Sequence, residues 1–263
     1  MKKLVSLTLA LVLALALTAC GGNETEHENI ELTVFAAASM QETLTEIGEL
    51  YMAEHENVTL VFNFDSSGTL KTQIQEGAEC DVFISAGQKQ MNELEELGLL
   101  LVDSRFDLLE NKVALAVPEG NPKGIEDYGD LKTALENGDV LLAMGNSDVP
   151  VGQYTQKILA YFGLDETALA EAGCITYGSN VKEVTTHVNE GAVDCGIIYA
   201  TDAFSAGLTV VDTATAEMCG QVIYPTAILK NGPYPEAAQD FLAFVVSDAG
   251  KAVLESVGFS PIG

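Results

Sequence analysis

Positive charge is scarce in this 263-residue chain, which has 12 lysines and arginines against 39 aspartates and glutamates. The formal net charge of −27 makes nucleic acid and anionic lipid surfaces poor partners for the folded part. Arg105 is the only arginine, and a small organic carboxylate is usually held by arginine in a bidentate pair. A small inorganic anion stays open, because directed N–H and O–H groups act at contact distance, whereas surface charge is screened beyond roughly 8 Å.

Residues for enzymatic chemistry are also few. The three histidines are His27, His55 and His187, and the sequence has no G-x-S-x-G nucleophile motif. A surface-anchored serine hydrolase that uses Ser39 or Ser67 as its nucleophile is therefore only a remote alternative. We predict that the protein is not an enzyme.

The cysteines show no metal-binding pattern. Apart from Cys20 there are Cys80, Cys174, Cys195 and Cys219, with no C-x-x-C pair and no histidine at ligand spacing. We expect no metal site and no cofactor. A disulfide between Cys174 and Cys195 stays open, but buried free thiols are favoured.

The N-terminus has the pattern of an export signal. Two lysines precede an apolar run over residues 4–17, which is too short to span a bilayer. The sequence Leu-Thr-Ala-Cys that ends at Cys20 resembles the lipobox of bacterial lipoproteins, in which the cysteine is diacylated and becomes the mature N-terminus. We therefore expect a signal peptide over residues 1–19, lipidation of Cys20, a tether over residues 20–29, and an extracytoplasmic protein that is anchored to the cell membrane.

Apolar runs typical of strands alternate with helical patterns along the rest of the chain, which predicts two α/β lobes with helices on both faces of parallel sheets. The predicted strands are residues 32–36, 58–62, 81–85, 113–117, 140–144, 174–177, 195–199 and 222–229. The predicted helices are residues 40–54, 69–76, 89–97, 131–136, 152–162, 181–190, 235–247 and 248–257.

The two terminal helices have no strand left to pair with in the second half, so the chain is expected to return to the first lobe. This predicts lobe I over residues 30–113 plus 226–263 and lobe II over residues 114–225. Two crossing strands, near residues 113–117 and 222–228, are expected to form a hinge between the doubly wound lobes.

Four predicted helices begin on small or backbone-donating residues: Ser39, residues 66–68, residues 150–152 and residues 179–181. Helix N-termini carry unpaired N–H groups and a positive dipole end, so several of them at one place form a site for a small anion. Tyr199, at the end of a predicted strand, adds a phenol donor. These positions supply only donors, which suits a fully ionised oxyanion such as sulfate, molybdate or tungstate.

Structural interpretations of the same residues remain open. Ser39 stands three residues before Glu42, which is the spacing of a helix capping box. Tyr199 at a strand end is also typical of simple packing. A protonated phosphate needs a carboxylate to accept its proton, and Asp65 is the candidate for that role.

Several motifs in series resemble the molybdate-binding component of bacterial ABC transporters, over about residues 31–259. The motifs are Phe35-Ala-Ala-Ala-Ser39, Ser66-Ser67-Gly68-Thr69-Leu70, Gln73-Ile74 followed by Gly77, Asp81-Val-Phe-Ile-Ser85, Val149-Pro150-Val151-Gly152-Gln153-Tyr154 and Gly196-Ile197-Ile198-Tyr199. The resemblance implies a type II periplasmic-binding-protein fold whose two lobes close over a tetrahedral oxyanion. It also implies capture of molybdate, and of tungstate as well, for a membrane permease driven by an ATPase.

Carried over by position, the resemblance gives Ser39 and Ser67 as hydroxyl and backbone donors, Val151 and Val181 as backbone donors, and Tyr199 as a hydroxyl donor. The metal of molybdate would be held through the same residues, as part of the oxyanion. A receptor of the same fold for sulfate or phosphate is the main alternative, and a monomer is expected.

This chain departs from the family pattern at two positions. Val151 stands where the family usually has alanine, and Gly68 stands where serine is common. A backbone donor survives the change to Val151, but its extra methyl groups are expected to narrow the pocket and to affect the choice among oxyanions.

Overall fold

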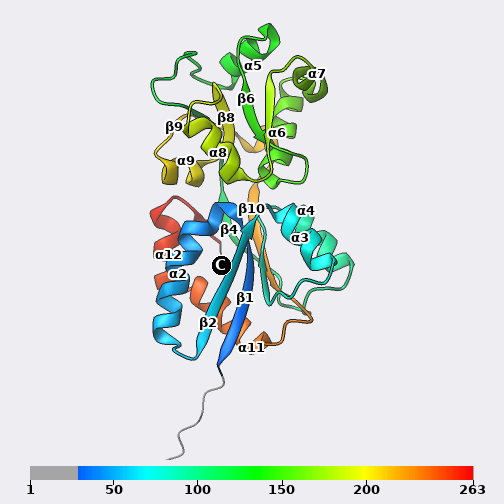
Figure 1. Ribbon diagram of the computed structural model, residues 1–263, viewed down its shortest axis with the longest axis vertical. Helices are drawn as coiled ribbons and strands as arrows, with labels where there is room; N and C mark the ends of the chain where they lie inside the picture. Colours follow the sequence, from blue (N-terminus) through cyan, green and yellow to red (C-terminus); the bar gives the residue numbers. More distant parts are fainter. Residues whose placement is uncertain (1–28, 263) are drawn as a thin grey trace, which may run out of the picture.

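The computed structural model describes residues 29–262, which form two α/β lobes placed one above the other (Figure 1). The signal peptide, Cys20 and nearly all of the tether lie outside the described residues. The first lobe contains a six-stranded sheet in the order β11-β4-β10-β3-β1-β2, and the second contains a five-stranded sheet in the order β7-β6-β8-β5-β9. The expectation of two α/β lobes with the type II periplasmic-binding-protein architecture is confirmed.

The strands of the first lobe are β1 (Ile30–Ala37), β2 (Val58–Asp65), β3 (Val82–Ile84), β4 (Phe106–Asn111), β10 (Val222–Ile228) and β11 (Ser260–Pro261). Its helices are η1 (Ala38–Met40), α2 (Gln41–Glu54), α3 (Ser67–Gln75), α4 (Gln88–Glu96), α11 (Pro235–Val245) and α12 (Asp248–Ser256). The strands of the second lobe are β5 (Val113–Val117), β6 (Leu142–Gly145), β7 (Ile175–Gly178), β8 (Cys195–Tyr199) and β9 (Thr209–Thr213). Its helices are α5 (Tyr128–Asn137), α6 (Pro150–Tyr161), α7 (Glu166–Glu171), α8 (Val181–Asn189), α9 (Ala200–Ala206) and α10 (Ala216–Cys219).

The side chains of β1 explain why helices cover both faces of the first sheet. Successive side chains of a strand point to opposite faces. Leu32 and Val34 belong to the core that includes Leu44 of α2, whereas Phe35 packs in a separate cluster with Leu70 of α3. Figure 1 shows α2 and α12 on one side of this sheet, with α3 and α4 on the other.

The parallel strands of both lobes bring their carboxyl ends to the region where the lobes meet. β1 pairs in parallel with β2 and β3 in the first lobe, and β6 pairs in parallel with β7 and β8 in the second. The loops that follow such strands are where open α/β sheets bind ligands. In Figure 1, β1 and β2 run toward the second lobe.

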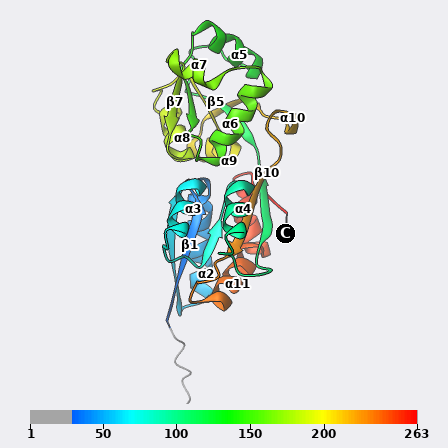
Figure 2. The ribbon, with the colours of Figure 1, turned by 90° about the vertical axis from the view of Figure 1, so that its right-hand side faces the viewer.

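The chain crosses between the lobes twice. The first crossing is at Lys112, which joins β4 of the first sheet directly to β5 of the second. The second runs through α10 into β10 (Figure 2). β10 pairs with β4 from Val222 onward, so the returning strand already belongs to the first sheet before the expected boundary at residue 226.

The cysteines in the described range, Cys80, Cys174, Cys195 and Cys219, are all buried and free. The bridge between Cys174 and Cys195 that the sequence left open is therefore not formed. Within residues 29–262, no helix has both the length and the apolar character that crossing a membrane requires.

Candidate functional site

A small cavity lies where the two lobes meet. Its volume is about 10 Å³, which is close to the space that one water molecule occupies. Both lobes line it, through Ala37, Ala38, Ser39, Asp65, Ser66, Ser67 and Ala86 from the first and Val149, Pro150, Val181 and Tyr199 from the second. A ligand larger than water therefore enters only when the lobes separate, and is then enclosed by both.

The cavity brings together most of the residues that the sequence pointed to. Ser39, Ser67, Val181 and Tyr199 all line it. Val151 is not among the lining residues of the described range, although Pro150, directly before it in the first turn of α6, is one of them. The N–H groups in the first turn of a helix have no partner within that helix, so α3, α6 and α8 all present donors in this region.

Ser39 does not cap a helix, so the capping-box interpretation is wrong. It lies inside the short helix η1, and within the described residues neither η1 nor α2 has a side-chain hydrogen bond at its N-cap. Its Oγ instead lies 2.9 Å from the hydroxyl of Tyr224 on β10, and both groups are buried. A contact between residues so distant in sequence gives no local signal.

The two serines after β2 have separate roles. Ser66 is the N-cap of α3, and its Oγ accepts a hydrogen bond from the N–H of Thr69 at 3.1 Å. Ser67 is the first residue of the helix and is fully buried, and its Oγ accepts the N–H of Ala86 at 2.9 Å. Because the Ser67 oxygen accepts that bond, its own proton can be donated toward the cavity.

Two hydrogen bonds join the lobes beside the cavity. Asn180 caps α8 and also donates its Nδ2 to Asp65 Oδ1 at 3.3 Å. The hydroxyl of Tyr199 donates to the carbonyl oxygen of Ala86 at 3.5 Å. Burial raises the pKa of Tyr199 well above its ordinary value, so the phenol keeps its proton and remains a donor.

The carboxylate oxygen Oδ1 of Asp65 accepts two hydrogen bonds from other groups of the protein. This oxygen accepts the N–H of Ser66 at 2.7 Å in addition to the Asn180 amide. The carboxylate therefore helps to shape the turn before α3 and to hold the two lobes together. This accounts for Asp65 without a role as acceptor for a protonated phosphate.

A charged cluster next to Val181 was not foreseen from the sequence. Lys182 Nζ lies 2.7 Å from Glu42 Oε2 of the first lobe and 3.1 Å from Asp202 Oδ1 of the second. The Asp202 side chain is completely buried, and burial raises its pKa to about 6 although the Lys182 ammonium opposes this rise. The ion pair between Lys182 and Glu42 therefore joins the two lobes.

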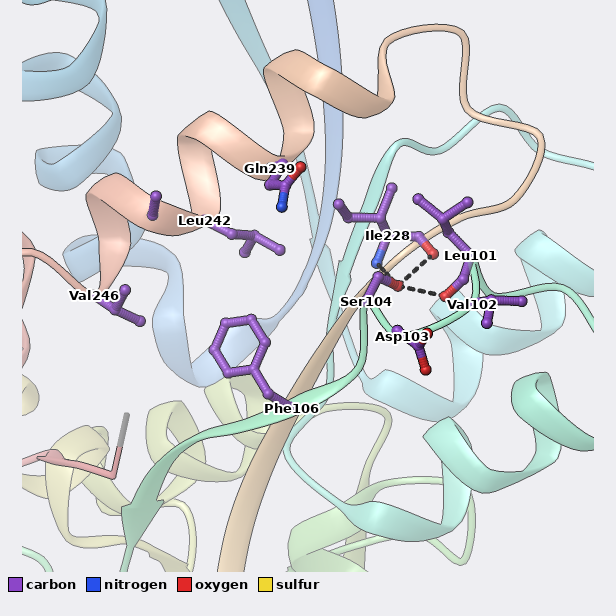
Figure 3. Close-up of a pocket in the computed structure, with 10 residues that line it drawn as sticks. Leu101, Val102, Asp103, Ser104, Phe106, Ile228, Gln239, Leu242 and Val246 are labelled. Atoms are coloured by element: carbon purple, nitrogen blue, oxygen red, sulfur yellow. Dashed lines mark hydrogen bonds between the residues drawn. The ribbon is translucent and has the colours of Figure 1, made fainter.

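Larger hollows occur elsewhere on the molecule. The one drawn in Figure 3 has a volume of about 430 Å³ and is lined mainly by apolar side chains, including Phe106, Leu242 and Val246. The hydroxyl of Ser104 in this hollow donates to the carbonyl of Leu101 at 2.7 Å and accepts the N–H of Ile228 at 3.1 Å. These bonds satisfy backbone groups, so the hollow offers no comparable anion site.

The cavity between the lobes is suited to a small oxyanion. The hydroxyls of Ser39, Ser67 and Tyr199 lie at the cavity, together with the N-terminal turns of α3 from the first lobe and of α6 and α8 from the second. Hydrogen bonds to a charged group contribute about 1.5–3 kcal/mol each, and helix N-termini add favourable dipoles. The surrounding groups are placed to bind and enclose an anion.

Comparison with known proteins gives a consistent result. Residues 32–260 match the family model described as bacterial extracellular solute-binding protein. The molybdate-binding protein ModA of Mycobacterium tuberculosis is 32% identical over 257 residues, which cover 95% of this chain and 94% of that protein. ModA of Haemophilus influenzae is 32% identical over 264 residues, with 99% of each chain covered. The solved periplasmic molybdate-binding protein of Azotobacter vinelandii shares the fold, with a TM-score of 0.78 at 22% identity over 88% of this chain and 100% of that one.

Proposed function

The chain belongs to the family of bacterial extracellular solute-binding proteins, and from this premise we propose that it captures molybdate outside the cytoplasm and delivers it to an ABC transporter. Proteins of this family bind a solute for transport and are not enzymes. The relatives named for molybdate match nearly the whole chain, which supports the choice of ligand. The observation that carries the proposal is the donor-lined cavity between the lobes.

In this proposal, the hydroxyls of Ser39, Ser67 and Tyr199 and the backbone N–H groups of Val151 and Val181 donate to the oxyanion. Molybdate near neutral pH is a dianion whose oxygens only accept hydrogen bonds, so a set of donors replaces its hydration shell. Opening of the lobes admits the anion and closure encloses it. The permease would then distinguish the closed form from the open one.

Titration calorimetry on the mature chain tests the ligand assignment. Molybdate, tungstate, sulfate and phosphate are titrated at the same ionic strength. We expect one-to-one binding of molybdate and tungstate, with much weaker binding of sulfate and phosphate. Tighter binding of sulfate or phosphate would move the protein to the alternative receptor class, and the absence of any oxyanion binding would contradict the proposal.

Replacing Ser67 with alanine is expected to weaken molybdate binding about tenfold, because the site loses one hydroxyl donor and the Ala86 N–H loses its acceptor. Calorimetry measures the change. Ser247→Ala is the matched control, because Ser247 also accepts a backbone N–H but caps α12 in the first lobe. The control should lose about 1 kcal/mol of stability and retain its affinity. Unchanged binding by Ser67→Ala would remove Ser67 from the site.

The proposal includes a lipid anchor at Cys20, tungstate as a second ligand, a permease with its ATPase as partners, and a monomeric receptor.

Cys20→Ser is expected to release the protein from membranes into the soluble fraction, because two acyl chains provide stable anchoring. Cell fractionation with fatty-acid labelling measures this. Labelling that persists in Cys20→Ser would show that the anchor lies elsewhere.

A further inference from the structure

We propose that Asn111 and Tyr224, two buried residues on the strands next to the lobe crossings, hold the hydroxyl of Ser39 as an obligate donor toward the ligand. The consequence is selectivity: the site favours a fully deprotonated oxyanion over a protonated one. This assignment rests on the proposed function, since it concerns how the same site chooses its anion. Asn111 and Tyr224 act as positioning residues through Ser39.

The orientation of the Asn111 amide is the starting point. Its Oδ1 accepts the N–H of Lys112 at 2.8 Å, which places the oxygen on that side and the Nδ2 group on the other. Nδ2 then donates one proton to Thr201 Oγ1 at 2.9 Å and one to the Tyr224 hydroxyl at 3.2 Å. A backbone N–H can only donate, so it fixes which end of the amide is which.

The direction of the next bond follows from the first. The Tyr224 oxygen accepts the Asn111 proton, and its own proton faces two hydroxyl oxygens, those of Ser39 and Tyr199. We assign this proton to Ser39, because Ser39 Oγ lies at a hydrogen-bond distance of 2.9 Å. Burial raises the pKa of Tyr224 well above its ordinary value, so this proton is retained. Ser39 Oγ therefore accepts from Tyr224, and its proton is left to point toward a ligand in the cavity that Ser39 lines.

The surroundings keep this chain of bonds in place. Ser39, Asn111, Thr201 and Tyr224 are all buried, and the Tyr224 ring packs edge-on against Tyr199 at 5.6 Å between ring centroids. Buried polar networks of this kind are strong only when every member is satisfied in a consistent direction. This series of hydrogen bonds begins at Asn111, beside the first lobe crossing at Lys112. A residue at the hinge therefore sets the direction in which the Ser39 hydroxyl donates.

The chemistry of the ligand makes this direction selective. Molybdate and sulfate have only acceptor oxygens, whereas monohydrogen phosphate carries one proton that needs an acceptor. All three are dianions at pH 8, so net charge does not separate them. A Ser39 hydroxyl whose proton points at the ligand presents no lone pair to the phosphate proton, while a hydroxyl free to rotate could accept that proton.

Two variants test the assignment by calorimetry with molybdate, sulfate and phosphate at pH 8. Tyr224→Phe removes the donor to Ser39, so we expect molybdate affinity to fall about fivefold and the preference for sulfate over phosphate to narrow. Asn111→Asp replaces the amide donor with an acceptor, so Tyr224 donates to residue 111 and Ser39 donates to Tyr224. The reversed Ser39 oxygen then accepts, and the preference for sulfate over phosphate should narrow about tenfold or more.

The ratio of affinities separates positioning from simple damage. The added negative charge of Asn111→Asp repels all three dianions alike, and a loosened structure weakens them alike, so neither effect changes the ratio. A ratio unchanged in both variants would overturn the assignment while leaving the proposed function intact. Absence of oxyanion binding by the unmodified protein would overturn the proposed function itself, together with this assignment.

Discussion

Replacing Gly68 with alanine is expected to weaken molybdate binding by at least about a hundredfold while the protein remains folded. A Cβ atom at this position would lie 2.1 Å from the carbonyl oxygen of Asp148 and 2.9 Å from its carbonyl carbon. Gly68 is on α3 of the first lobe, and Asp148 is in the loop between β6 and α6 of the second. The clash with the backbone therefore exists only when the lobes are in contact. A hundredfold loss corresponds to about 2.7 kcal/mol of binding free energy.

The same substitution should not destabilise the open protein. Gly68 is the second residue of α3, and alanine is favoured over glycine in a helix by up to about 1 kcal/mol. Calorimetric binding and thermal unfolding without ligand together measure both effects. Gly129→Ala is the matched control, because Gly129 is the second residue of α5 and its added Cβ would meet only the Asp127 side chain, with Oδ1 at 3.0 Å. Normal binding by Gly68→Ala would show that this close approach is not needed to hold the ligand.

Gly68 also shows which feature of the site could not be predicted from the sequence. Its motif predicted a helix start near a ligand, and serine is the common residue there in the family pattern that the sequence resembles. The reason for glycine is a contact with a loop on the other lobe, which no local pattern contains. The places of Ser67, Val181 and Tyr199 at the cavity could be predicted, because they follow from strand ends and helix starts. The contacts between the lobes could not, because they depend on how the two lobes pack against each other.

The fold was predictable where apolar runs are long and unbroken. β8 and β10 lie within predicted strands, because most of their side chains are buried, and β1 extends the predicted strand over residues 32–36 at both ends. β4 and β9 were not predicted. Asp107 and Glu110 interrupt the apolar residues of β4, and β9 is an edge strand in which every side chain is exposed or half-buried. Such strands form because a neighbouring strand supplies their hydrogen bonds, and the sequence pattern reports this weakly.

Ser39 and Glu42 show the same limit within the site. Their spacing fits a capping box, yet each finds a distant partner: Ser39 bonds Tyr224, and Glu42 pairs with Lys182 of the second lobe. Local competition between a cap and a tertiary contact is decided by burial and by the available partners. The place of Ser39 at the cavity was therefore predictable, while its contact with Tyr224 was not.

Asp202 is expected to make the free energy of unfolding fall as pH rises from about 4 to 6. Burial raises the pKa of Asp202 from 3.8 to about 6, so between these values the folded protein binds a proton that the unfolded chain releases. The stabilising contribution is fully present below the unfolded pKa and is lost as pH rises through the folded one. The shift corresponds to at most roughly 3 kcal/mol.

Urea denaturation at several pH values between 4 and 7 measures this effect, and Asp202→Asn isolates it from the other carboxylates. The variant should lack this contribution to the pH dependence, so the difference in stability between the two proteins should change across the window. Lys182→Met provides the second comparison. It removes the cation 3.1 Å from Asp202 Oδ1, so the pKa of Asp202 should rise further and the loss of stability should extend to higher pH. Identical pH dependence in all three proteins would mean that the pKa of Asp202 is the same in the folded and the unfolded protein.

Lys182 also pairs with Glu42 across the lobes, so Lys182→Met should in addition weaken molybdate binding, whereas Asp202→Asn leaves that pair in place.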